Sequence, residues 1–361
     1  MKNSTNFCLI LTLVLFTIFR TNAQIDSNQY QLSDTIEFEG DFFDIDAPFD
    51  CSLEFNIKAY QRSKNKGQYL PAKLSFYDQK DSLLTTRQVR LKARGNFRRS
   101  HCSLPPLWLN IKKANVASEE FESVNKMKIV THCRMSSTYQ SAIIKEFLAY
   151  SIYRVISPYS FRVRLMEIRY IDTGRKNKEN KNWAFIIEPE AMMAERLNAM
   201  PFKLDNISRD QTMEYETDVM SLFQYMIGNS DYSIMTRHNV KLIKLKDLSV
   251  PYPIPVPYDF DYTGIVNAPY AEPGENLGIE KITDRYFLGP CRTREEYQNA
   301  MNVFIQKKEN IYEVVKSFPY ASAKTKKDVI DYLNEFYNQI EKSWFIEFNL
   351  ESTCFKKSSD N

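Results

Sequence analysis

Two short segments in the second half of the chain place acidic and amide side chains at the edges of apolar, strand-like runs. The first contains Asp231 and then Asn239, which opens the apolar residues 240–243. The second contains Asp259 and Asp261, close behind Val256. One carboxylate can orient or deprotonate a hydroxyl, while an amide oxygen and a second carboxylate can hold Mg²⁺ or Mn²⁺ against phosphate groups. The two segments together therefore predict phosphoryl transfer to a hydroxyl acceptor.

Each segment also has an ordinary structural explanation. Gly-Asn-Ser-Asp (residues 228–231) is a common turn sequence, because Asn and Asp bond to their own backbone. Asp-Phe-Asp-Tyr (residues 259–262) alone is common at the end of a strand. We favour the chemical interpretation because both segments occur together, in this order, after a strand-rich first half.

Strands dominate the pattern before these segments and helices the pattern around and after them. Short alternating runs broken by Gly, Asn and Pro predict antiparallel strands with one buried face, near residues 53–57, 72–76, 89–93 and 107–111. Apolar residues at helical spacing predict one early helix over residues 143–155, which Pro158 ends. A hairpin is expected around the basic residues 174–182, followed by helices over residues 213–227, 295–315 and 324–345.

This order of elements predicts an α+β fold with two lobes, a strand-rich N-terminal lobe and a mainly helical C-terminal lobe. The segments that we expect to carry the chemistry belong to the second lobe. The predicted organisation is a signal peptide (1–23), an acidic leader (24–50), the strand-rich N-lobe with one early helix (51–188), the mainly helical C-lobe (189–350) and a polar tail (351–361).

The first residues are typical of an exported bacterial protein. Lys2 precedes an apolar run at residues 8–19, and small residues around Ala23 suit a cleavage site. A run of this length is too short for a permanent span, although a retained anchor is the alternative. No later segment approaches about 20 consecutive apolar residues, so no permanent membrane span is expected. We therefore predict a periplasmic or extracellular protein.

Cysteines and charge narrow the possible partners. Besides Cys8 in the predicted signal peptide, the chain has five cysteines: Cys51, Cys102, Cys133, Cys291 and Cys354. An odd number leaves at least one thiol unpaired within the chain. There is no CxxC spacing and the histidines are isolated, so a structural zinc site is not expected. The formal net charge is +3 with both signs mixed along the chain, which gives no reason to expect a nucleic-acid partner.

The ordered motifs resemble those of the CotH family of atypical kinases and, more distantly, HipA-type kinases. The resemblance covers most of residues 90–265 and implies a protein-kinase-like fold. It rests on these stretches: Arg94-Gly95-Asn96-Phe97, KMKIVTH (126–132), QSAIIKEFLAY (140–150), RVRLMEIRYID (162–172), FIIE (185–188), GNSDYSIMTRHN (228–239) and PYDFDYTG (257–264).

The resemblance implies a role for each matching residue. Asp231 would be the catalytic residue that faces the acceptor, and Asn239 and Asp259 would bind the metal, with Asp261 as a second ligand. The nucleotide, ATP or another, would be bound by a further group of residues. In it Arg94, Gly95 and Asn96 form a loop over the phosphates, Lys128 contacts the α/β-phosphates, Glu146 is the ion-pair partner of Lys128, and Glu188 ends a hinge beside the adenine. Lys112 is the rival for the lysine role.

Three departures from the kinase pattern leave alternatives open. Seven residues separate Asp231 from Asn239, compared with about four in a typical protein kinase, an Asp-Phe-Asp triplet replaces Asp-Phe-Gly, and no GxGxxG is present. One hypothesis is an exported, metal-dependent phosphotransferase acting on an unknown protein or small-molecule acceptor. The alternative is a catalytically inactive protein on the same scaffold that serves as a periplasmic or surface binding module, and a hydrolase is a weaker third option. The oligomeric state cannot be inferred.

Overall fold

The computed structural model describes residues 42–44, 47–77, 80–111, 126–204, 207–274 and 277–356. All of these belong to one compact unit, residues 36–361. The predicted signal peptide, most of the acidic leader, Lys112 and the end of the polar tail lie outside the described residues.

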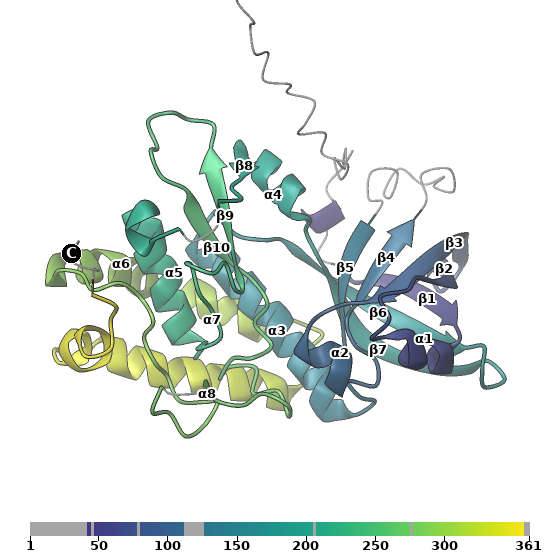
Figure 1. The fold of residues 1–361 in the computed structure, drawn as a ribbon. Helices are drawn as coiled ribbons and strands as arrows, with labels where there is room; N and C mark the ends of the chain where they lie inside the picture. Colours follow the sequence, from purple (N-terminus) through teal and green to yellow (C-terminus); the bar gives the residue numbers. More distant parts are fainter. Residues whose placement is uncertain are drawn as a thin grey trace, which may run out of the picture. The chain divides into compact units, whose positions relative to one another are not determined.

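A closed β-barrel forms the first half of this unit (Figure 1). Its strand order is β1-β2-β3-β4-β5-β7-β6, antiparallel throughout except between β1 and β6, whose parallel pairing closes the barrel. The strands are β1 (Phe49–Phe55), β2 (Leu70–Tyr77), β3 (Leu83–Ala93), β4 (Leu107–Ile111), β5 (Lys126–Thr131), β6 (Val163–Asp172) and β7 (Lys178–Ile187). Alternate residues of each strand fill the interior, as the alternation in sequence predicts.

The second half combines helices with a small sheet. The sheet has the order β10-β9-β8, from β8 (Ala199–Pro201), β9 (Val240–Leu245) and β10 (Ile254–Pro257). Its helices are α4 (Glu190–Arg196), α5 (Glu214–Met226), α6 (Arg294–Gln306), α7 (Lys308–Ser317) and α8 (Ala323–Ile340), with the π-helix η5 (Ile346–Glu351) and the 3-10 turn η4 (Arg209–Gln211). The helix predicted before Pro158 is α3 (Ser137–Ile156), and it packs against β7 on one side and α7 and α8 on the other (Figure 1).

The predicted two-lobed, protein-kinase-like fold is wrong. The strands of the first half close into a barrel rather than an open sheet, and β8, β9 and β10 form a second sheet where a mainly helical lobe was expected. Alternation in sequence shows that one face of a strand is buried, but it does not show which edges pair. The pairing that closes the barrel joins Phe49 to Met166, which are far apart in sequence, so no local pattern reports it.

Several element boundaries also differ from the prediction. The expected start of the N-lobe falls inside β1. The 3-10 turn η2 (Phe42–Asp44) adds Phe42 and Phe43 to the buried cluster that contains the barrel residues. Two short helices were not predicted, α1 (Ile57–Ser63) and α2 (Phe97–His101). Asn56 caps α1 through a hydrogen bond from Ala59 N, a signal that the sequence does offer.

Two disulfides join four of the five cysteines. Cys102 pairs with Cys133 and Cys291 with Cys354, which leaves Cys51 buried as a free thiol, as the odd count requires. Within the part of the chain that the structure describes, we find no helix with the length and apolar character of a membrane crossing.

Candidate functional site

Asp231 lies in the turn after α5, and the local sequence holds its carboxylate in place. Asn229 Oδ1 accepts a hydrogen bond from Asp231 N at 2.8 Å, so the expected Asx turn is present. Asn239 Nδ2 donates to Asp231 O at 2.7 Å and to Asp231 Oδ2 at 3.0 Å. His238 Nε2 lies 2.9 Å from Asp231 Oδ1, and this hydrogen bond raises the pKa of His238. The turn and the residues before β9 therefore orient one half-exposed carboxylate.

The β9–β10 hairpin brings the two sequence segments together. Val240 pairs with Pro257, and Tyr258 N donates to Asn239 O at 3.0 Å, so the residues before β9 meet those after β10. Asn239 and Asp259 both adopt positive φ, at 51° and 65°, which is uncommon for residues other than glycine. Such backbone conformations persist only where the surroundings impose them, and they are enriched at functional sites.

Three carboxylates from two elements form a compact cluster. Glu146 of α3 and the pair Asp259 and Asp261 each offer one oxygen, and these oxygens all lie within 4.8 Å of one another. Burial, and after it the charge of Asp259, raises the pKa of Asp261 to about 6. Burial and then the charge of Asp261 raise the pKa of Glu146. We call these three residues the carboxylate cluster.

The carboxylate cluster fits a hard divalent cation. Its ligands are oxygens, which Mg²⁺ and Mn²⁺ prefer. Glu146 Oε1 is buried and has no hydrogen-bond partner among the described residues, so one oxygen is left for a ligand. Asp259 is only half-buried, which leaves the cluster an accessible member.

Arg98 of α2 partly neutralises the cluster. Its Nη1 lies 3.7 Å from Glu146 Oε2 and 3.7 Å from Asp261 Oδ2, and its Nη2 donates to Thr131 O. Tyr270 Oη donates to Asp261 Oδ2 at 3.0 Å. One guanidinium among three carboxylates leaves a net negative charge, which a divalent cation would balance.

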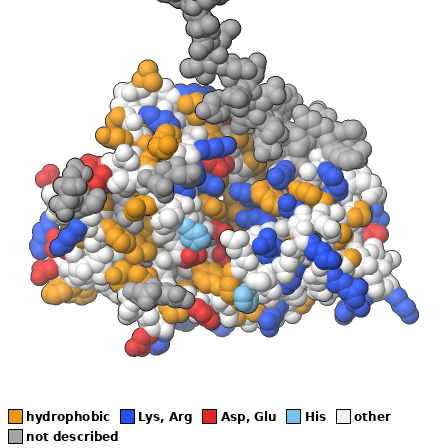
Figure 2. Space-filling model, viewed as in Figure 1, with side chains coloured by type: hydrophobic (Ala, Val, Ile, Leu, Met, Phe, Trp, Pro, Cys, Tyr) orange, Lys and Arg blue, Asp and Glu red, His pale blue; other side chains and the backbone are white. Residues whose placement is uncertain are grey.

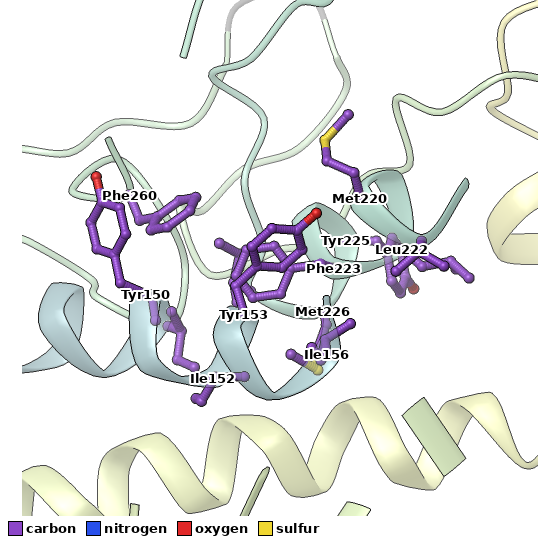
Figure 3. Packing of buried hydrophobic residues seen from close by; sticks show 14 of the residues in the cluster. Tyr150, Ile152, Tyr153, Ile156, Met220, Leu222, Phe223, Tyr225, Met226 and Phe260 are labelled. Carbon is purple, nitrogen blue, oxygen red and sulfur yellow. The ribbon is translucent and has the colours of Figure 1, made fainter. Parts of the chain in front are cut away.

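Aromatic packing fixes the turn that carries Asp259 and Asp261. Tyr150 of α3 packs against Phe260 with ring centroids 4.5 Å apart, and its hydroxyl accepts a hydrogen bond from Asp259 N at 2.8 Å (Figure 3). Phe223 of α5 lies between Phe260 and Tyr153 in the same layer (Figure 3). This packing therefore holds the candidate metal ligands of α3 and of the turn next to each other.

Close packing also explains two glycines in the predicted motifs. A Cβ on Gly228 would lie 2.1 Å from Tyr332 Oη, and one on Gly264 would lie 2.2 Å from the same oxygen. The backbone at Gly228 and Gly264 is hydrogen-bonded, with Gly264 N donating to Gly228 O at 3.0 Å. The turn of Asp231 and the turn of Asp259 are therefore linked on this side too.

Lys128 of β5 lies beside the site. Burial and the nearby charges of Arg94 and Lys241 lower its pKa to about 8, whereas Glu190 and Asp259 act in the opposite direction. Its ammonium lies 5.7 Å from the ring centroid of Tyr258, the residue before Asp259. Glu146, expected as its ion-pair partner, pairs with Arg98 instead.

The structure places the other predicted nucleotide-binding residues in different surroundings. Arg94 acts electrostatically on Lys128, whereas Gly95 and Asn96 lie exposed in the turn that leads into α2. Glu188 is fully buried and bonded to Arg162 and Arg196, so its carboxylate serves the fold. The structure therefore gathers six predicted residues in one region: Asp231, Asn239, Asp259, Asp261, Glu146 and Lys128. The carboxylate of Glu188 is engaged by Arg162 and Arg196 instead.

Sequence reasoning missed two residues of the site. Arg98 stands four positions after the Arg94 that we singled out, and no local pattern shows that it turns inward. His238 directly precedes Asn239, so its place beside Asp231 could have been inferred once the turn was assumed. Comparison with protein-family models and with curated proteins gave no match. The resemblance to the CotH family therefore remains a prediction.

Proposed function

We propose that this chain is a divalent-metal-dependent phosphotransferase, which moves a phosphoryl group from a nucleotide to a hydroxyl acceptor. The observation that carries the proposal is the convergence of the Asp231–Asn239 turn with the carboxylate cluster, beside Lys128. The resemblance of the motif order to that of the CotH family, through which these residues were first assigned, agrees with the proposal.

The residues divide the work by chemistry. Asp259 and Asp261, with Glu146, would hold Mg²⁺ or Mn²⁺, which would draw negative charge from the phosphate oxygens. Lys128 would contact the donor phosphates, and its pKa of about 8 keeps it mostly charged near neutral pH. Arg94 lies close enough to Lys128 to share that role.

Asp231 would orient the acceptor hydroxyl. The acceptor oxygen bonds to phosphorus as the phosphoanhydride bond of the donor breaks, the nucleoside diphosphate leaves, and the proton of the hydroxyl passes to Asp231. The Asp231 carboxylate accepts from His238 and Asn239 and keeps further lone pairs for the acceptor. Both contacts hold it in one orientation.

Export is part of the proposal. The signal-peptide pattern predicts it, and the Cys102–Cys133 and Cys291–Cys354 disulfides are characteristic of oxidising compartments. The acceptor would then be a protein or small molecule of the periplasm or the extracellular space.

The test is metal and nucleotide binding by the purified protein, measured by calorimetry with Mn²⁺ and then with ATP. Asp259→Asn should lower the Mn²⁺ affinity about 10-fold or more, by analogy with the loss of metal-site residues. Asn tolerates positive φ, so the variant removes charge without adding backbone strain. Asp247→Asn, an exposed acid in the β9–β10 connection, is the control. Equal Mn²⁺ affinity in wild type and Asp259→Asn, with both folded, would exclude the proposed metal site.

A catalytically inactive binding module is the second candidate, and Arg98 is the observation that favours it. A buried guanidinium already compensates part of the cluster charge, and Glu146 and Asp261 have side chains only 1% and 10% exposed. On this alternative Mn²⁺ would not bind at all, and Asp259→Asn would leave partner binding unchanged. The same titration therefore separates the two functions.

A further inference from the structure

A row of alternating aromatic and basic side chains crosses the outer face of the barrel next to the site. Lys128 of β5 pairs in register with Trp108 of β4, and Trp108 pairs with Lys92 of β3. Tyr69, the residue before β2, lies beneath Lys92, whose Nζ is 5.3 Å from its ring centroid. Because residues at alternate positions share one face of a strand, Arg90 and Lys126 stand in the neighbouring row.

The cations of this face, which we call the cationic face, share their aromatic neighbours. Lys126 and Lys128 lie 4.5 and 5.5 Å from the Trp108 ring centroid, and Arg94 lies 5.9 Å from it. Figure 2 shows Lys and Arg side chains gathered beside hydrophobic ones over the barrel strands. Among the described residues, none of the cations on this face forms an ion pair with an acid.

Three cations elsewhere on the same barrel are neutralised by acids. Lys73 of β2 pairs with Glu54, Lys181 with Glu167 and Arg169 with Asp50 and Asp81. Like charges that stand side by side repel one another, and Arg94 and Lys241 already lower the pKa of Lys128. A cationic face with no acidic partner among the described residues therefore points to an anionic ligand.

We propose that the cationic face binds a chain of linked phosphate groups that extends outward from the donor position, a subsite that rests on the proposed function. Lys128 lies near enough to both Arg94 and Asp259 to interact with their charges, so Lys128 and Arg94 would contact the phosphates close to the metal. Arg90, Lys92 and Lys126 continue the positive charge across β4 to β3, about 10 Å away at the usual strand spacing. The chain could belong to a nucleoside polyphosphate or to inorganic polyphosphate.

A phosphate chain fits this face better than a nucleic acid or an acidic glycan. The aromatic faces of Trp108 and Tyr69 are occupied by cations, so they are not free platforms for bases or sugar rings. Cations on adjacent strands also lie close together, which matches a ligand with a charge on every short repeat. Polyphosphate has that charge density, and most glycans do not.

The test compares ligands of different length by equilibrium titration without metal, using tripolyphosphate and a long polyphosphate. The long chain should bind wild type about 10-fold more tightly at low salt. Lys92→Gln and Lys126→Gln should each weaken long-chain binding roughly three- to five-fold, lower the salt slope by about 1, and leave tripolyphosphate affinity unchanged. Lys73→Gln, whose lysine is already paired, is the matched control.

Several outcomes would overturn the subsite: no preference for the long chain, unchanged long-chain binding in both lysine variants, or equal binding of a sulfated polysaccharide. The affinities of adenosine tetraphosphate and inorganic tetraphosphate identify the source of the phosphate chain. Tighter binding of adenosine tetraphosphate would show that the ligand is a nucleoside polyphosphate. Asp259→Asn should bind long polyphosphate with the affinity of wild type, because Asp259 lies outside the cationic face. If Asp259→Asn loses Mn²⁺ binding while wild type fails to bind long polyphosphate, the proposed function stands and only the phosphate-chain subsite is excluded.

Discussion

At the residue scale, the site depends on buried groups whose charge is fixed by their neighbours. Arg98 serves both Glu146 and Asp261, and a buried charge without a partner is strongly destabilising. The same guanidinium lowers the pKa of His132, after the larger effect of burial. The polar core around the carboxylate cluster is therefore held by one cation that the sequence did not identify.

His132 should make the stability of the protein depend on acid pH. Burial, aided by Arg98, lowers its pKa to about 4, below the ordinary 6.5 of the unfolded chain. Between these values the unfolded state binds a proton that the folded state does not, so stability is lost as pH falls from about 6.5 to 4. The loss is about 3 kcal/mol, the equivalent of the difference in pKa.

The measurement is the free energy of unfolding by denaturant at several pH values, for wild type and His132→Phe. The variant cannot bind the proton, so its advantage relative to wild type should grow by about 3 kcal/mol from pH 7 to pH 4. Other titrating groups, among them Asp261, contribute to both proteins and cancel in the difference. A difference that does not change with pH would show that folding leaves the pKa of His132 unchanged, contrary to the prediction.

Sequence patterns identified the site residues whose chemical type stands out in the local sequence. They missed the residue that joins the site only because the fold buries it. Asp231, Asn239 and Asp259 stand out because acidic and amide groups border apolar runs, and they do come together. Glu146 is expected to pair with Lys128 because the resemblance to atypical kinases implies an ion pair between a strand lysine and a helix glutamate. Its true partner, Arg98, depends on how α2 folds back, which is a tertiary property without a local signal.

At the scale of elements, long periodic segments were predicted and pairing was not. α3 and α5 show apolar residues at helical spacing. α5 lies within one residue of its expected bounds, and α3 ends where expected but begins at Ser137, six residues earlier than predicted. The expected helix over residues 295–315 is divided at Lys307 into α6 and α7, because the chain changes direction there. The short α2 is stabilised by what it contacts, so the sequence alone gave no reason to expect it.

The Cys102–Cys133 disulfide should hold α2, and with it Arg98, against the end of β5. α2 has five residues, too few for a helix to be stable alone, and Cys102 directly follows it. Replacing both cysteines with serine should lower the free energy of unfolding by about 4 kcal/mol, as expected for a loop of this size. It should also speed amide hydrogen exchange in residues 97–102.

The second disulfide provides the control for this prediction. Cys291→Ser with Cys354→Ser should also lower stability, but exchange in residues 97–102 should stay as in wild type, since that disulfide joins the segment before α6 to the end of the described chain. Equal exchange in both double variants would mean that packing, and not the disulfide, positions α2.

At the scale of the whole molecule, two hydrophobic cores share the same strands. In β5, Ile129 faces the barrel interior while Val130 faces the core of α3 and the later helices. In β7, Ile186 faces the barrel and Phe185 and Ile187 face the other core. Each strand therefore belongs to both cores, which explains why residues 36–361 form one compact unit rather than two lobes.

This sharing predicts one cooperative unfolding transition. Leu109 in the barrel and Leu333 in α8 are both fully buried, each in a different core. Leu109→Ala and Leu333→Ala should each lower the free energy of unfolding by about 2–5 kcal/mol, through lost burial and the cavity left behind. Loss of either core removes the strands that the other core needs, so both substitutions should shift the same transition.

Two single-tryptophan proteins would check this, one keeping Trp108 in the barrel and the other Trp344 after α8. Leu109→Ala should shift the fluorescence midpoint by the same amount in the Trp108 protein and in the Trp344 protein. The same equality should hold for Leu333→Ala. A shift confined to Trp108 in Leu109→Ala, with Trp344 unchanged, would mean that the barrel unfolds on its own. The strands β5, β6 and β7 would then have to stay folded against α3 without the barrel, which their shared residues make unfavourable.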